Sequence, residues 1–141
     1  MQDTRTLKLK ASLENVPLAV ELAARSARAA GLDEQAVYEV QVAVDEACAN
    51  VVEHAYAGGE PGAMEVSCRA DSRTFAIRVR DWGSSFEPHR VEDPDVTAPL
   101  EERTLGGLGV FLIRQYMDRV EYTFDPKLGN ELLMTKSLAP E

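Results

Sequence analysis

Residues 33–56, DEQAVYEVQVAVDEACANVVEHAY, contain a regular apolar pattern. Small aliphatic side chains recur at the three- and four-residue spacing of one helix face, and they are Val37, Val40, Val44, Ala47 and Val51. Asp33 can cap the start of this helix, and the glycines and proline of residues 57–62 break it after Tyr56. The sequence therefore predicts one long helix with a core-facing stripe.

Segments with alternating polar and apolar side chains lie on both sides of this helix. They predict strands at residues 6–12, 64–70, 75–79, 120–124 and 131–138. Two further helices are expected, one between Asn15 and Gly31 and one after the glycines at 106–109. Residues 84–104 lack such a period and predict a long loop. Because the helices are grouped apart from the strand pairs, the order predicts an α+β two-layer sandwich.

Length and charge narrow the class of protein. A chain of 141 residues predicts a single domain over residues 1–141, because domains usually hold roughly 100–200 residues. The 24 acidic and 15 basic residues give a net charge of -9, which repels a phosphate backbone and argues against direct nucleic-acid binding. Cys48 and Cys68 have no CxxC spacing, so neither a zinc site nor a disulfide framework is indicated. No apolar run is long enough for a signal peptide or a membrane span. A cytoplasmic protein with no membrane contact is expected.

Polar side chains interrupt the long apolar helix near its end. Glu46 and Asn50 are four residues apart, so they share one helix face. A carboxylate and a carboxamide within one turn can place a general base beside a magnesium ion, because magnesium takes oxygen ligands and is often held by few protein groups together with phosphates. The alternative interpretation is an ordinary solvated helix face.

A carboxylate also stands where a strand pattern asks for an apolar residue. Counting by twos from Phe75 places Asp81 on the apolar side of its strand, where an unpaired carboxylate is costly. Asp81 therefore needs a hydrogen-bond donor, and the amino group of adenine is one candidate. Gly83 leaves room for a flat group to approach the backbone. The alternative donor is a structural arginine or a turn amide.

The glycines of residues 106–109, GGLG, open the helix that follows the long loop. Glycines let backbone amides face an anion, and a helix N-terminus adds the positive end of its dipole, so phosphate is the expected guest. The spacing matches neither a Walker loop nor a dinucleotide-binding fingerprint. A glycine-rich hinge explains the same residues.

The three features together carry a family resemblance. The ordered stretches 45–56 (DEACANVVEHAY), 81–86 (DWGSSF) and 106–118 (GGLGVFLIRQYMD) resemble the GHKL ATPases, and within them the chain is most similar to the anti-sigma-factor serine kinases of bacterial partner-switching systems. The resemblance implies a Bergerat-type ATP-binding fold, with helices on one face of a mixed, mainly antiparallel sheet. It also implies that residues 86–105 form an ATP lid.

The resemblance further implies roles for individual residues. Asn50 matches the magnesium-coordinating asparagine and Glu46 the acid that acts as general base. Asp81 matches the adenine-binding aspartate. The remaining expected nucleotide contacts are Gly83, Gly106, Gly107, Gly109 and Thr135. The wider superfamily often has a second glycine at the position of Ser85. The serine found here resembles the variant of the anti-sigma kinases.

The resemblance implies an enzyme with two protein partners. It would bind ATP and Mg2+, sequester a sigma factor and phosphorylate an anti-sigma-factor antagonist, a STAS-type domain with an acceptor serine. A homodimer is compatible with it. Two alternatives remain at this point: a nucleotide-binding module that sequesters a partner without phosphoryl transfer, and a detached ATPase domain of a histidine kinase. The presence of Glu46 favours a kinase over a pure binding module, and the lack of a preceding helical segment with an acceptor histidine argues against the second alternative.

Overall fold

The computed structural model describes residues 3–56, 62–83 and 107–138. Its elements, in chain order, are β1 (Asp3–Lys10), the 3-10 turn η1 (Leu13–Asn15), α1 (Val16–Ala29), α2 (Glu34–Asn50), the π-helical turn η2 (Val51–Ala55), β2 (Ala63–Ala70), β3 (Thr74–Asp81), α3 (Gly107–Tyr116), β4 (Arg119–Asp125) and β5 (Gly129–Ser137). The predicted order of strands and helices is confirmed. The predicted loop at 84–104 and the predicted lid at 86–105 lie outside the described residues.

The long helix forms as its pattern predicts, with a change of geometry at its end. The Asp33 carboxylate accepts a hydrogen bond from the backbone N–H of Ala36 at 2.8 Å, which caps α2. All members of the predicted apolar stripe are buried. After Asn50 the helix continues as the π-helical η2, a feature that often marks functional sites. Nothing in the sequence pattern predicted this change.

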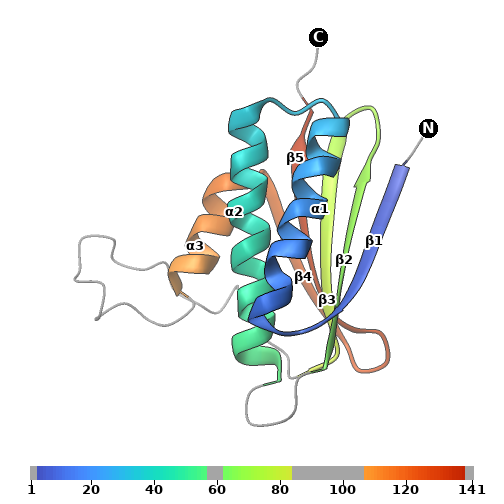
Figure 1. The fold of residues 1–141 in the computed structure, drawn as a ribbon, viewed down its shortest axis with the longest axis vertical. Helices are drawn as coiled ribbons and strands as arrows, with labels where there is room; N and C mark the ends of the chain where they lie inside the picture. Colours follow the sequence, from blue (N-terminus) through green and yellow to red (C-terminus); the bar gives the residue numbers. More distant parts are fainter. Residues whose placement is uncertain (1–2, 57–61, 84–106, 139–141) are drawn as a thin grey trace.

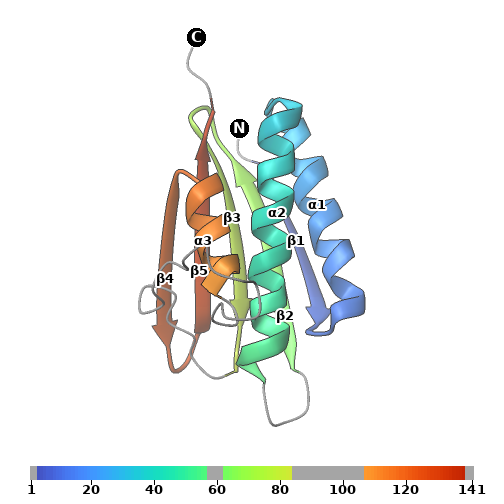
Figure 2. The same cartoon turned by 90° about the vertical axis from the view of Figure 1, so that its left-hand side faces the viewer.

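The strands form one antiparallel sheet. Its order is β1-β2-β3-β5-β4, and every neighbouring pair among the described strands is antiparallel. Figures 1 and 2 show α1, α2 and α3 packed on a single face of this sheet, with α1 on the side of β1 and α3 on the side of β4. The predicted two-layer α+β sandwich is therefore confirmed, and the expected mixed character of the sheet is not seen in these strands.

The core lies between the helices and the sheet. Phe75, Met64, Ile77 and Met134 are fully buried from the strand side, where they meet the valines of α2. The opposite face of the sheet carries ion pairs, in which Glu131 is bonded to both Arg78 and Arg80. Strand alternation thus divides β5 into a helix-facing row and an open-face row.

Two boundaries differ from the sequence prediction. β1 begins at Asp3 and ends at Lys10, earlier than the predicted 6–12, and the Ala11 N–H bonds the carbonyl of Gly62 at 2.8 Å. The helix α3 already begins at Gly107. No helix within the described ranges is long and apolar enough to cross a membrane.

Candidate functional site

A pocket lies between α2, α3 and the C-terminal half of the sheet. Its walls are mostly apolar, and two polar side chains that the sequence singled out, Asn50 and Asp81, both line it. The lining residues are Ala47, Asn50, Val51, Ala55, Val79, Asp81, Val110, Ile113, Arg114, Val120, Tyr122 and Leu132. An apolar cavity with a few convergent polar groups is the usual form of a small-molecule site.

Asn50 and Glu46 stand one helical turn apart, but in different surroundings. Asn50 is buried at the end of α2 and lines the pocket. Glu46 is half-buried and does not belong to the residues that line the pocket. Burial raises the pKa of the Glu46 carboxyl, and the negative charges of Asp45 and Glu53 raise it further. A carboxyl with a raised pKa is a better proton acceptor than an ordinary surface glutamate.

Asp81 is buried on the helix-facing side of β3, as its place in the alternation predicted. Its Oδ1 accepts hydrogen bonds from the Gly83 N–H at 2.9 Å and from Asn130 Nδ2 at 2.8 Å. Burial raises the pKa of Asp81, and these two hydrogen bonds oppose that rise. A turn amide is thus one donor to Asp81. Both of these bonds end on the same carboxylate oxygen, Oδ1.

Asn130 is a site residue that the sequence analysis missed. It is almost fully buried at the start of β5, directly opposite Asp81 in the register of β3 and β5. Its Nδ2 also donates to the Gly83 carbonyl at 3.1 Å. Asn130 therefore holds both the carboxylate and the turn that follows it. The sequence pattern of β5 carried no usable signal for it, because Leu132, Leu133 and Met134 are consecutive apolar residues and leave the buried face of the strand undecided.

Gly83 is required by a close approach within the protein. A Cβ at this position would lie 2.0 Å from the backbone carbonyl oxygen of Ala55, at the end of η2. The flat group that approaches this glycine is thus a peptide unit of the helix that carries Asn50. Tyr56 reinforces the same junction, since its hydroxyl donates to the Ala63 carbonyl at 2.6 Å and accepts from the Trp82 N–H at 3.0 Å.

Gly83→Ala is expected to lower the free energy of unfolding by about 1–3 kcal/mol, because the backbone of Ala55 must shift to admit the methyl group. Denaturant unfolding monitored by circular dichroism measures this loss. Gly31→Ala is the matched control: Gly31 has a φ of 96° but nothing within 4 Å of its Cβ position, so that variant reports conformational strain alone. A smaller loss for Gly83→Ala than for Gly31→Ala would contradict the close-approach argument.

The remaining predicted contacts divide into three groups. Gly107 and Gly109 lie in the first turn of α3, whose later residues line the pocket. Gly106 lies outside the described residues. Thr135 is not brought to the pocket: it lies in the open-face row of β5, between Met134 and Lys136, which face the helices. Thr135 is therefore not among the residues that line this pocket, and its contact with adenine stays a prediction.

The donor set near Asn50 fits a magnesium ion better than a transition metal. The described residues contain no group of three or more His, Cys, Asp or Glu side chains that could hold a metal by themselves. The pocket is instead lined by Asn50, whose side-chain amide contains one hard oxygen, and the Glu46 carboxylate stands one turn away on α2. Magnesium accepts such a sparse set of hard oxygen ligands when phosphate oxygens complete its shell.

The histidine kinase-like ATPase domain family matches residues 9–136 of this chain. The chain belongs to this family. The match includes every residue that lines the pocket, and the family is one of ATPases.

Relatives within the histidine kinase-like ATPases are protein kinases by name. The serine-protein kinase RsbW of Listeria monocytogenes is 35% identical over 140 residues, which cover 96% of this chain and 88% of the relative. RsbW of Halalkalibacterium halodurans is 39% identical over 106 residues, covering 72% and 63%. The serine/threonine-protein kinase BtrW of Bordetella bronchiseptica is 30% identical over 105 residues, covering 74% and 72%. These relatives confirm the prediction of an ATP-dependent protein serine kinase.

Proposed function

We propose that this protein is an anti-sigma factor of the partner-switching type, which binds Mg-ATP, sequesters a sigma factor and phosphorylates an anti-sigma-factor antagonist on serine. The observation that carries the proposal is the convergence of Asn50 and Asp81 on one apolar pocket. It is supported by similarity to a serine-protein kinase over 96% of the chain.

The two polar residues assign a direction to the bound nucleotide. Asp81 offers a buried acceptor to the amino group of adenine, so the base lies at the β3 end of the pocket. The phosphates extend toward Asn50 and the first turn of α3. There the first turn of α3, which contains Gly107 and Gly109, would offer its backbone amides to an anion.

The residues on α2 serve the transfer itself. Mg2+ held by Asn50 and the phosphate oxygens would neutralise the charge that develops on the transferring group. Glu46 accepts the proton of the antagonist's serine hydroxyl as that oxygen attacks the γ-phosphorus and the bond to ADP breaks. The products are phosphoserine and ADP, and the proton rests on Glu46 until solvent removes it.

A second candidate function is a nucleotide-binding module that sequesters its partner without phosphoryl transfer. Glu46 stands outside the pocket lining, so nucleotide binding by itself does not require it. The two are separated by incubating the protein with γ-labelled ATP and a STAS-type antagonist. Label on the antagonist that disappears when its acceptor serine is changed to alanine supports the kinase. Tight ATP binding with no transferred label supports the binding module.

The homodimer and the sigma-factor complex stay predictions. Light scattering tests the homodimer, and pull-down assays test the complex with a sigma factor.

Asn50→Ala is expected to abolish the magnesium dependence of ATP binding, because it removes the protein's oxygen ligand to the ion. Calorimetric titration of ATP with Mg2+ and with a chelator measures the difference. Gln41→Ala is the matched control, since it removes an amide from α2 that does not line this pocket. A variant Asn50→Ala that still gains affinity from Mg2+ to the same extent as the unaltered protein would assign the ion to other residues.

When the pH is lowered, the phosphoryl-transfer rate is expected to fall at a higher pH than it would if the base were a glutamate with an ordinary pKa. The reason is that Glu46 works as a base only when ionised, and burial together with Asp45 and Glu53 raises its pKa. Single-turnover rates at saturating ATP, measured over a series of acid to neutral pH values, give the size of this effect. ATP affinity is measured separately at each pH. If the same fall of the rate at low pH, the acid limb of the profile, persists in Glu46→Gln, a different ionisable group causes it.

A further inference from the structure

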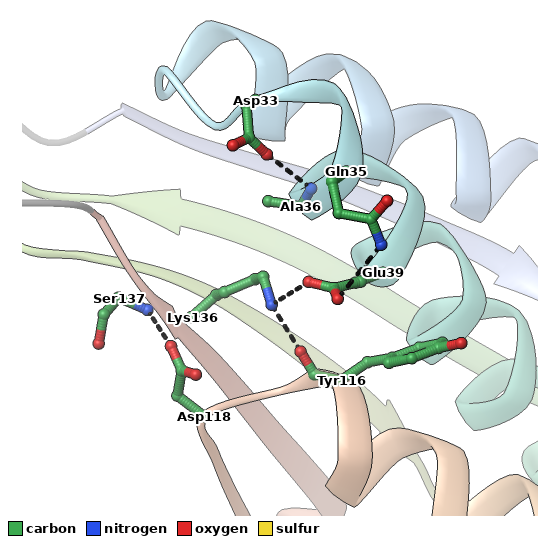
Figure 3. A network of polar contacts seen from close by, with 8 residues as sticks. All are labelled: Asp33, Gln35, Ala36, Glu39, Tyr116, Asp118, Lys136 and Ser137. Atoms are coloured by element: carbon green, nitrogen blue, oxygen red, sulfur yellow. Dashed lines mark hydrogen bonds and ion pairs between the residues drawn. The ribbon is translucent and has the colours of Figure 1, made fainter.

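Lys136 is a buried cation on the helix-facing side of β5 that the ATP site does not use. Its side chain is 11% exposed, and its Nζ lies 2.8 Å from Oε1 of Glu39 on α2. Nζ also donates a hydrogen bond to the backbone carbonyl of Tyr116 at 2.6 Å, as Figure 3 shows. Burying an ammonium group costs free energy unless it is paired. These contacts meet that requirement by joining β5, α2 and α3 at one atom.

The carbonyl that Lys136 binds belongs to the last residue of α3. A helix leaves its final carbonyls without intrahelical partners, and its C-terminus carries the negative end of the helix dipole. The lysine therefore acts as a cap on α3. The other oxygen of Glu39 accepts from Gln35 Nε2 at 3.5 Å, one turn earlier on α2, which orients the carboxylate toward the lysine.

Two more hydrogen bonds hold the same end of α3. The Asp118 N–H donates to the Thr135 carbonyl at 2.9 Å, and the Asp118 carboxylate accepts from the Ser137 N–H at 2.6 Å. The ring of Tyr116 also packs against Tyr38 of α2, with 6.3 Å between the ring centroids. The segment that joins α3 to β4 is therefore hydrogen-bonded to residues 135–137 of β5.

The helix α3, whose C-terminal end is held by these contacts, forms one wall of the ATP pocket. Val110, Ile113 and Arg114 of α3 line it, and Ile113 lies one turn before Tyr116. The Met117 N–H donates to the Ile113 carbonyl at 3.0 Å, which links that wall to the fastened end. The wall therefore depends on where the C-terminus of α3 is held.

We infer that Lys136 and Glu39 are positioning residues for nucleotide binding: their ion pair caps α3 and holds its pocket-lining side at the distance from α2 that the nucleotide requires. This inference rests on the proposed function. Glu46 and Asn50 lie on α2 itself, so they keep their places when the cap is lost. The pair therefore governs KM for ATP and the affinity for ADP, and leaves kcat at saturating ATP nearly unchanged.

The test compares four variants with the unaltered protein in Mg-ADP calorimetry, kinase kinetics and amide hydrogen exchange of residues 110–116. Lys136→Met removes the charge and keeps most of the length. Glu39→Gln removes the partner's charge with little change of shape, and it carries the test if Lys136→Met fails to fold. Lys136→Arg keeps the charge as the conservative variant. Arg28→Met is the matched control, because it breaks the exposed pair of Arg28 with Glu34.

Lys136→Met and Glu39→Gln are each expected to raise the Kd for Mg-ADP and the KM for ATP by about 3- to 30-fold. They are also expected to speed exchange of the α3 amides without nucleotide. Lys136→Arg is expected to restore most of the affinity, and Arg28→Met to change it less than twofold. Unchanged affinity and unchanged exchange in both variants, or an equal effect of Arg28→Met, would overturn the inference. If the unaltered protein binds no nucleotide, the proposed function fails, and the exchange data alone still decide whether the pair caps α3.

Discussion

Glu46→Gln is expected to slow serine phosphorylation by about 10²- to 10⁴-fold while Mg-ATP affinity stays within about twofold. The amide keeps the size of the side chain but cannot accept the serine proton at neutral pH. Binding is spared because Glu46 does not line the pocket. Single-turnover transfer to the antagonist measures the rate, and calorimetry measures the affinity.

The control for this variant is Asp45→Asn. Asp45 is the neighbouring residue, it is exposed, and its charge contributes to the raised pKa of Glu46. Removing it is expected to leave the transfer rate within a few-fold and to shift the acid limb to lower pH, because one repulsive charge is gone. If Glu46→Gln weakens ATP binding as much as it slows transfer, the assignment of Glu46 to proton transfer is wrong.

Asp81→Asn is expected to weaken ADP and ATP binding by roughly 1.5–3 kcal/mol with the fold retained. The Gly83 N–H and Asn130 Nδ2 both donate to Oδ1 of Asp81, so they will hold the amide oxygen of an introduced asparagine in that place. Its NH2 group then takes the place of the other carboxylate oxygen. This NH2 group and the amino group of adenine are both donors, so they cannot form a hydrogen bond with each other.

The base specificity of this variant gives a sharper test than affinity alone. Guanine presents a carbonyl acceptor where adenine presents an amino group, so Asp81→Asn is expected to narrow the preference for ADP over GDP. Calorimetry with both nucleotides measures the ratio, and thermal unfolding without nucleotide checks the fold. An undiminished preference for ADP in Asp81→Asn would remove Asp81 from base recognition.

Much of the site could be predicted because its residues contradict their local pattern. Asp81 occupies an apolar position in a strand, and Asn50 interrupts an aliphatic helix, so each stands out without knowledge of its neighbours. Asn130 carries no such local signal, because it follows the β4–β5 turn, where asparagine is common. Its contact with Asp81 arises from the pairing of β3 with β5 and joins residues 49 apart in sequence.

Thr135 shows why the faces of β5 were harder to assign. Leu132, Leu133 and Met134 are three consecutive apolar residues, so alternation does not say which side of the strand is buried. Pairing with β3 decides this, because Met134 lies opposite Ile77, whose side chain belongs to the core. Thr135 then falls on the open face, beside Leu133.

The sequence by itself determined the α2 stripe, the cap at Asp33, the alternation of the strands and hence the two-layer sandwich, because these depend on periods of two and 3.6 residues that a chain carries locally. Only the tertiary structure decided what each buried polar group bonds. The approach of Ala55 to Gly83, the hold of Asn130 on Asp81 and the pairing of Lys136 with Glu39 all join separate elements. Such contacts depend on register and packing between elements, and no local period encodes them.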